Sequence, residues 1–129
     1  MRGRRKTAKI SEAEWNIMKV LWSGNGNNGR GMTLGEIVNS LSDTTGWSDT
    51  TIRTLIIRLS EKGAVSIDKT TGVYKYKAIP SFEESVKEET AAFVKRVFDG
   101  DSVKMILSLI SGTTLTDAER EEISLSLGT

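Results

Sequence analysis

Between residues 48 and 58, hydroxyl side chains and the guanidinium of Arg58 lie at helical spacing. Thr50, Thr54 and Arg58 are four residues apart, so on an α-helix they stack one turn above another, with Thr51 beside them. Such side chains can hydrogen-bond phosphates and base edges, and an arginine can donate two hydrogen bonds to guanine O6 and N7. The pattern favours a helix that enters the DNA major groove. The alternative is a solvated surface without a ligand.

The other side of the same helix is apolar. Four residues at positions i, i+3, i+4 and i+7 form one stripe, namely Ile52, Leu55, Ile56 and Leu59. Ser48 is expected to cap the N-terminus through its hydroxyl, and Trp47 to pack on Ile52 as a hydrophobic staple. Lys62 and Gly63 end the helix, since a cation suits the C-terminal dipole and glycine accepts positive φ. The stripe and the caps together predict a helix whose polar face points outward.

Two capped helices are predicted before this one. Ser11-Glu12-Ala13-Glu14 and Thr33-Leu34-Gly35-Glu36 both have the capping-box pattern, and each opens a short amphipathic helix. The first helix is expected to end at Trp22, and the second to end before a loop over 42–46. Three short helices with the last one presented outward indicate a helix-turn-helix.

After the third helix the pattern changes to a period of two. Val65 and Ile67 alternate with polar residues, 69–72 read as a turn, and a second strand is expected over 73–78. A hairpin that directly follows a helix-turn-helix makes a winged helix. Lys69 and Lys75 are therefore candidates to lie along the phosphates beside the groove.

Three further helices are predicted after Pro80. The segment 102–111 is apolar around most of its circumference, so it must be buried on more than one side. Because these helices carry more apolar surface than they can cover, we expect a second copy of the chain to cover it. The alternative is a helical hairpin folded back on its own winged helix. The predicted dimer contacts are Phe93, Val97, Phe98, Met105, Ile106, Leu109, Ile110 and Ile123.

The expected fold is mainly α with a small β-wing. We expect a basic disordered tail over 1–9, a winged-helix DNA-binding domain over 10–79 and a helical dimerisation domain over 80–129. Residues 1–80 contain 13 Lys/Arg against 7 Asp/Glu, whereas residues 81–129 contain 5 against 10. A basic half joined to an acidic half indicates that only the first half meets a polyanion.

The composition argues against catalysis. The 129 residues include no cysteine and no histidine, which excludes disulfides, Cys/His zinc sites and every reaction that depends on either side chain. No Gly-rich phosphate loop or paired-carboxylate signature is present, so neither an enzyme nor a cofactor is expected. One acidic cluster could hold a divalent cation, but an acidic first helical turn that complements the dipole is the simpler interpretation. This cluster consists of Glu83, Glu84, Glu88 and Glu89.

The sequence also bears on location. No apolar run approaches the roughly 20 residues needed to span a bilayer. The basic N-terminus is not followed by the apolar stretch of a secretory signal. We therefore expect no membrane insertion and a cytoplasmic location.

Taken in order, these motifs resemble the penicillinase-repressor (BlaI/MecI/CopY) family over residues 10–127. The resemblance implies a homodimeric transcriptional repressor that binds an inverted-repeat operator in double-stranded DNA through the third helix and dimerises through the C-terminal helices. Carried over by position, the family's DNA contacts fall on Ser48, Thr50, Thr51, Thr54 and Arg58. The motifs that carry the resemblance are Ser11-Glu12-Ala13-Glu14-Trp15, Met18-Lys19-Val20-Leu21-Trp22, Trp47-Ser48, Thr51-Ile52-Arg53-Thr54-Leu55-Ile56, Arg58-Leu59, Lys62-Gly63-Ala64 and Val73-Tyr74-Lys75-Tyr76.

The resemblance also implies how such a repressor is released. In the β-lactam branch a partner, a membrane sensor protease, cuts the helical region between Asn and Phe; the corresponding pair here is Ser108-Leu109. The copper branch uses Cys-x-Cys pairs, which this chain lacks. Asp49-Thr50 stands where many members have Pro-Lys, which removes a positive charge beside the groove. A winged-helix protein–protein adaptor without specific DNA binding is therefore the alternative function.

Overall fold

The structure is a computed structural model that describes residues 9–23 and 29–128. The predicted disordered tail, apart from Lys9, lies outside the described residues. The chain divides into two compact units between Ser85 and Val86, and each unit is described by itself. Across the described ranges, no helix combines the length and the apolar character that crossing a membrane requires.

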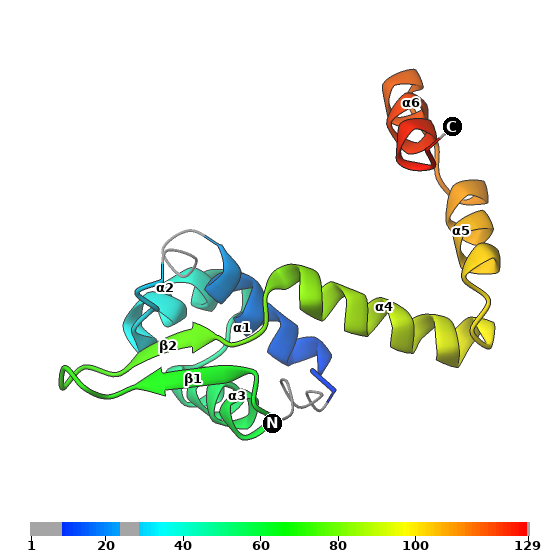
Figure 1. Cartoon of the computed structure of the whole chain (residues 1–129). Coiled ribbons are helices and arrows are strands. Elements are labelled where there is room, and N and C mark those ends of the chain that lie inside the picture. The colour runs from blue at the N-terminus through cyan, green and yellow to red at the C-terminus, as the bar shows by residue number, and fades with distance from the viewer. Residues whose placement is uncertain (1–8, 24–28, 129) are drawn as a thin grey trace. The chain divides into compact units, whose positions relative to one another are not determined.

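The first unit is a helix-turn-helix followed by a β-hairpin (Figure 1). The strands pair antiparallel, with Val65 opposite Ala78 and Asp68 opposite Lys75. The predicted fold class, mainly α with a small β-wing, is confirmed. The helices are α1 (Glu12–Trp22), α2 (Leu34–Thr45) and α3 (Asp49–Glu61), and the strands are β1 (Val65–Asp68) and β2 (Lys75–Ala78).

Side chains from all three helices share one hydrophobic core. Capping boxes at Ser11 with Glu14 and at Thr33 with Glu36 fix where α1 and α2 begin, because each satisfies two backbone amides that lack a partner within the helix. The apolar stripe of α3 faces the same core. The stripe and the most deeply buried residues of the other two helices are Ile17, Met18, Leu21, Ile37, Ile52, Leu55, Ile56 and Leu59.

α2 is longer than its sequence pattern predicts. The predicted loop over 42–46 is wrong for all but its last residue, since the helix continues through Thr45. The hydroxyls of Thr44 and Thr45 donate to the Leu41 carbonyl at 3.2 and 2.8 Å, which supports the last turn. Gly46 then ends the helix in the left-handed conformation, with φ of 71°.

β2 is shorter than predicted, because it begins at Lys75 and not at residue 73. The ladder stops at the Asp68–Lys75 pair. Beyond it, the Asp68 carboxylate accepts hydrogen bonds from the Thr70 backbone amide at 2.9 Å and from its hydroxyl at 2.7 Å. These bonds turn the chain away from the strand direction, so Val73 and Tyr74 belong to the hairpin turn.

A third segment of backbone pairs with β2. The Met32 amide donates to the Tyr76 carbonyl at 2.9 Å, and the Tyr76 amide donates to the Met32 carbonyl at 2.8 Å. The preceding residue, Gly31, has φ of 82°, and a Cβ there would lie 3.0 Å from the Tyr76 carbonyl oxygen. Only glycine allows this close approach, which attaches the start of α2 to the hairpin.

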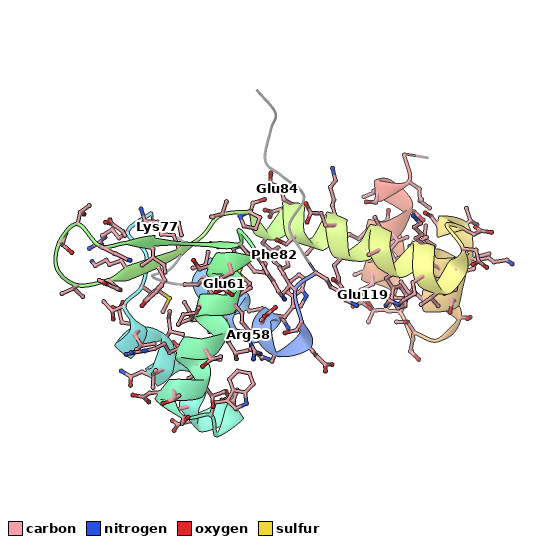
Figure 2. All side chains as sticks on the ribbon, turned by 90° about the horizontal axis from the view of Figure 1, so that it is seen from below. Arg58, Glu61, Lys77, Phe82, Glu84 and Glu119 are labelled. Carbon is pink, nitrogen blue, oxygen red and sulfur yellow. The ribbon has the colours of Figure 1, made fainter. Side chains whose placement is uncertain are left out.

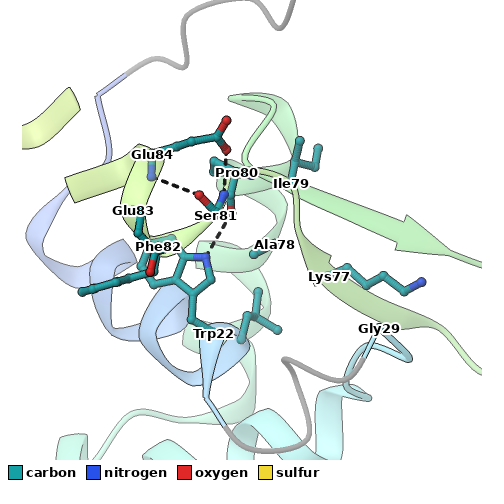
Figure 3. Close-up of a pocket in the computed structure, with 11 residues that line it drawn as sticks. Trp22, Gly29, Lys77, Ala78, Ile79, Pro80, Ser81, Phe82, Glu83 and Glu84 are labelled. Carbon is teal, nitrogen blue, oxygen red and sulfur yellow. Dashed lines mark hydrogen bonds between the residues drawn. The ribbon is translucent and has the colours of Figure 1, made fainter. Parts of the chain in front are cut away.

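Trp22 joins the end of α1 to the chain that leaves the hairpin (Figure 3). Its indole Nε1 donates to the Pro80 carbonyl at 3.0 Å, and its ring meets that of Phe82 edge to face, with centroids 5.4 Å apart. The Glu84 amide donates to Ser81 Oγ at 3.0 Å, and the Ser81 amide donates to Glu84 Oε1 at 2.8 Å. This reciprocal pair is a capping box, and it starts α4 (Phe82–Phe98).

The second unit contains the remainder of α4, α5 (Ser102–Ser111) and α6 (Asp117–Ser126). The chain turns between α4 and α5 at Asp99 and Gly100, whose φ values are 54° and 86°. Among the described residues of this unit, Val94 is the one buried hydrophobic side chain. Every residue of α5 and α6 is described, and none is buried. Both helices therefore present their apolar side chains to solvent.

Candidate nucleic-acid interface

α3 has an exposed polar face that lies opposite its buried stripe. Ile52, Ile56 and Leu59 on the inner side are 0–1% exposed. The five side chains predicted from the sequence to contact DNA through this helix are all exposed, which places them on one accessible surface of the first unit. They are Ser48, Thr50, Thr51, Thr54 and Arg58.

Hydrogen bonds within α3 determine what its hydroxyls can offer a ligand. Thr54 Oγ1 donates to the Thr50 carbonyl at 2.9 Å, so its proton is used and the oxygen can act only as an acceptor toward a ligand. Ser48 Oγ accepts from the Thr51 amide at 3.2 Å, which makes Ser48 the N-cap. This surface can therefore accept hydrogen bonds from adenine N6 or cytosine N4 and can contact a thymine methyl group.

The C-terminal end of α3 is held by an ion pair that sequence reasoning missed. Lys62 Nζ lies 2.5 Å from Glu14 Oε1, and it also donates to the Lys9 carbonyl at 2.7 Å. The Glu14 side chain is 2% exposed. Burial acts to raise the pKa of Glu14, but hydrogen bonds from Lys62 and from the Ser11 amide outweigh burial, so the pKa lies below the ordinary value of 4.5. The pair ties α3 to the start of α1.

Replacing Glu14 with glutamine is expected to lower the free energy of unfolding by about 1–3 kcal/mol at pH 7, because glutamine keeps the capping geometry but not the charge that pairs with Lys62. Because the pKa of Glu14 is lower in the folded than in the unfolded state, ionised Glu14 stabilises the fold above pH 4.5. That stabilisation is lost as the pH falls through the folded-state pKa. Urea titrations at pH 7 and pH 3 measure the free energy of unfolding of the wild type and of E14Q. The difference between the two proteins should be smaller at pH 3 than at pH 7. Glu12→Gln is the control, since Glu12 is exposed in the same turn; an equal loss in both variants contradicts this role of the pair.

The hairpin carries the two lysines that the sequence predicts as phosphate contacts. Lys69 is exposed in the turn, and its Nζ lies 5.3 Å from the centroid of the Tyr74 ring. Lys75 is half-buried in β2, opposite Asp68. The Thr70 amide and hydroxyl lower the pKa of Asp68, and the charges of Lys77 and Lys75 add to this effect. Lys69 is the more accessible of the two predicted phosphate contacts.

Three residues of α3 that contribute to this surface were missed at the sequence level. Ile57 is 46% exposed, and Arg53 is exposed beside it on the side of the hairpin. Glu61 is exposed one turn after Arg58 and places a negative charge at the end of the same face (Figure 2). Helical spacing could have assigned all three to the exposed side of α3. Only the position of the hairpin shows that Arg53 and Ile57 lie beside the hairpin.

The predicted dimer contacts lie on α4, α5 and α6 of the second unit. Phe98 and Met105 are half-buried, and the Phe93 and Phe98 rings meet with centroids 6.0 Å apart. Ser108 and Leu109, the predicted cleavage pair, are exposed in α5. The other six predicted dimer contacts are 37–58% exposed, namely Phe93, Val97, Ile106, Leu109, Ile110 and Ile123.

The acidic cluster at the start of α4 does not converge on a point. Glu84 accepts from the Ser81 amide as part of the capping box. Within the described ranges, no group of three or more acidic side chains is placed to hold a metal ion. Glu83, Glu84, Glu88 and Glu89 thus have no shared cation position in this structure.

The fold and the exposed face define a class of protein. A helix-turn-helix whose third helix presents hydroxyls and a guanidinium, followed directly by a two-stranded wing, is the architecture of winged-helix DNA-binding proteins. Solved structures agree. The chain matches the DNA-binding domain of the repressor BlaI with a TM-score of 0.52 and 32% identity, over 63% of this chain and 93% of that one.

Sequence comparisons identify the family. The family model described as Penicillinase repressor matches residues 10–128. The penicillinase repressor of Bacillus licheniformis is 31% identical over 121 residues, which cover 92% of this chain and 89% of the relative. The methicillin resistance regulatory protein MecI of Staphylococcus aureus is 30% identical over 119 residues, or 92% of each chain. The chain belongs to the penicillinase repressor family.

Membership of this family makes the chain a winged-helix transcriptional repressor. The sequence prediction that it is not an enzyme is confirmed, because the family consists of repressors. A further match is the solution structure of the monomeric form of Bacillus licheniformis BlaI in complex with the blaP half-operator. It has a TM-score of 0.50 and 33% identity, over 61% of this chain and 90% of that one.

Proposed function

We propose that this protein is a homodimeric repressor that binds an inverted-repeat operator through α3. The observation that carries the proposal is the exposed face of α3, in which Thr50, Thr54 and Arg58 stand over a fully buried stripe. A BlaI relative has been solved on a half-operator, and a half-operator is what one recognition helix would occupy. Ser48 and Thr51 would bind phosphates or base edges at the N-terminal end of the helix.

The wing would add phosphate contacts beside the groove. Lys69 is exposed in the hairpin turn, and Lys75 reaches the surface from β2. Contacts of this kind position a protein on the duplex without reading its sequence. Base selection would then rest on Thr54, in the middle of α3, and on Arg58, in its last turn.

Dimerisation would follow from the second unit. α5 and α6 expose isoleucine and leucine side chains that a folded monomer normally buries, including Ile106 at 50% and Leu109 at 58%. Two copies related by a two-fold axis would cover these faces and place two α3 helices in successive major grooves, about 34 Å apart. The operator would accordingly be an inverted repeat.

Release from DNA would follow from loss of this dimer. Cleavage of the Ser108–Leu109 bond by a membrane sensor protease would separate Ile110 and Ile123 from the DNA-binding unit. The bond lies in α5, where both residues are exposed in the single chain. A monomer that keeps only one half-site contact would then dissociate from the operator.

A salt titration tests DNA binding against the adaptor alternative. The logarithm of the association constant for duplex DNA should fall linearly with the logarithm of the salt concentration, with a slope of about −4 or steeper. This follows because a dimer that contacts several phosphates releases their counterions. Fluorescence anisotropy with an inverted-repeat duplex and a random duplex measures both slopes. No binding to either duplex, or a flat response, would favour the protein–protein adaptor.

A further inference from the structure

A cleft of about 550 Å³ lies between α3 and the hairpin. α2 supplies one edge of its lining, α3 contributes Arg53 and Ile57, and the hairpin turn contributes Lys69, Val73 and Tyr74. All of these residues belong to the first unit. The volume falls within the range of roughly 300–1,000 Å³ that is usual for sites of small organic molecules.

The lining combines exposed apolar surface with positive charge. Ile57, Val73 and Tyr74 are 46%, 55% and 48% exposed and line the same cleft, so they form one exposed apolar patch. Arg53 and Lys69 are the charged residues among those that line the cleft, and both are cationic. The lining is therefore complementary to a molecule with an apolar body and an anionic end.

We propose that this cleft binds a small aromatic carboxylate. The ring would lie against Ile57 and Val73 and stack on Tyr74, as aromatic pairs prefer an offset arrangement. The carboxylate would accept two parallel hydrogen bonds from the N–H groups of Arg53, because a planar guanidinium matches the geometry of a carboxylate. A DNA phosphate could use the same cation, but it has no apolar part to cover the three exposed hydrophobic side chains. The mixed lining therefore favours the small molecule.

Occupation of the cleft would oppose DNA binding. This consequence rests on the proposed function, in which α3 and Lys69 both meet DNA. The bound carboxylate would neutralise Arg53 and so remove a positive charge between the recognition helix and the wing, where phosphates would pass. A ligand that binds free protein more tightly than DNA-bound protein must weaken DNA binding by the same factor. The cleft would thus give the repressor an inducer besides proteolysis.

Calorimetry of the full chain without DNA tests the site itself. With 2-naphthoate as the probe, we expect a dissociation constant of about 0.1–1 mM, in line with the affinity per atom of small ligands. Arg53→Gln should weaken binding by about tenfold or more through loss of the charged hydrogen bonds. Val73→Asp, a change in the exposed turn, should weaken it similarly by charge repulsion. The matched control Lys95→Gln, on α4, should bind as the wild type does.

The neutral amide of the same ring, 2-naphthamide, tests the role of the charge. Binding of the amide as tightly as the acid would overturn the proposal, as would equal affinities of wild type, R53Q and V73D with circular dichroism showing all three folded. No heat of binding by the wild type at 5 mM probe, about five times the weakest constant expected, would also overturn it. These outcomes do not depend on DNA, so they stand whether or not the proposed function does.

A second arm tests the link to DNA. Saturating 2-naphthoate should raise the dissociation constant for operator duplex at least about fivefold, the low end of typical coupling between sites. The amide should leave that constant unchanged. An unchanged constant in the presence of bound 2-naphthoate would overturn the inducer role.

Discussion

Replacing Ile106 and Ile110 together with aspartate is expected to convert the protein to a monomer and to weaken binding to an inverted-repeat duplex by about 100-fold or more. The two side chains lie four residues apart on one face of α5 and are 50% and 44% exposed in the single chain. Four buried carboxylates at a two-fold interface would be desolvated without partners, which a dimer cannot tolerate. A monomer also contacts only one half-site. In the dimer, once one subunit is bound, the second half-site is present at an effective concentration on the order of millimolar, and the monomer loses this gain in affinity.

Analytical ultracentrifugation and fluorescence anisotropy measure the two effects in the same samples. Affinity for an isolated half-site should change by less than about twofold, because the side chains of α3 are untouched. The matched control is the double variant Ser108→Asp and Ser111→Asp, which adds the same charge to the opposite face of α5. If I106D/I110D still sediments as a dimer, or if the control loses the dimer to the same extent, the proposed interface is wrong.

The helix that carries the candidate DNA-binding face could be predicted because its signals are local. The spacing of Ile52, Leu55, Ile56 and Leu59 predicts the inner face of α3, and all four are buried. The N-cap at Ser48 is also confirmed. Once the inner stripe is fixed, the geometry of 3.6 residues per turn determines which side chains point outward. Both faces of α3 therefore follow from the sequence.

Contacts between residues that are distant in sequence could not be predicted in the same way. Glu14 and Lys62 are 48 residues apart, and each has a local explanation, one as a capping residue and the other as a charge near a helix end. Nothing in the spacing shows that they pair. The cleft beside Arg53 is similar, since its far wall comes from the turn of the hairpin. Sequence periodicity assigns faces to elements, but the packing of those elements decides which faces meet.

The end of α2 shows a third limit. Thr44, Thr45 and Gly46 favour a turn by composition, yet the hydroxyls of both threonines donate back to Leu41 and extend the helix to Gly46. Threonine supports a helix end or a loop equally well from its local chemistry. The connection between α2 and α3 is therefore shorter than the sequence predicts, and it holds α3 close to the helix before it.

Replacing Arg58 with alanine is expected to weaken binding to the operator by about 1–3 kcal/mol, or roughly 5- to 150-fold, if its guanidinium donates two hydrogen bonds to a guanine. Arg58 is exposed one turn after Thr54 on the outer face of α3. Arg58→Lys keeps the charge but not the planar pair of donors, so it should recover phosphate attraction without the base preference. Fluorescence anisotropy at fixed salt, with operator and random duplexes, separates the two contributions.

The lysine variant decides what Arg58 does. If it restores operator affinity fully, Arg58 acts through charge alone, and the base-reading role is wrong. If the alanine variant loses the same factor on operator and random duplex, the guanidinium contacts phosphate and not base. Lys104→Ala, which removes one positive charge from the second unit, is the matched control and should leave both affinities within about twofold. Only a loss confined to the operator, left unrepaired by lysine, places the recognition of a guanine on Arg58.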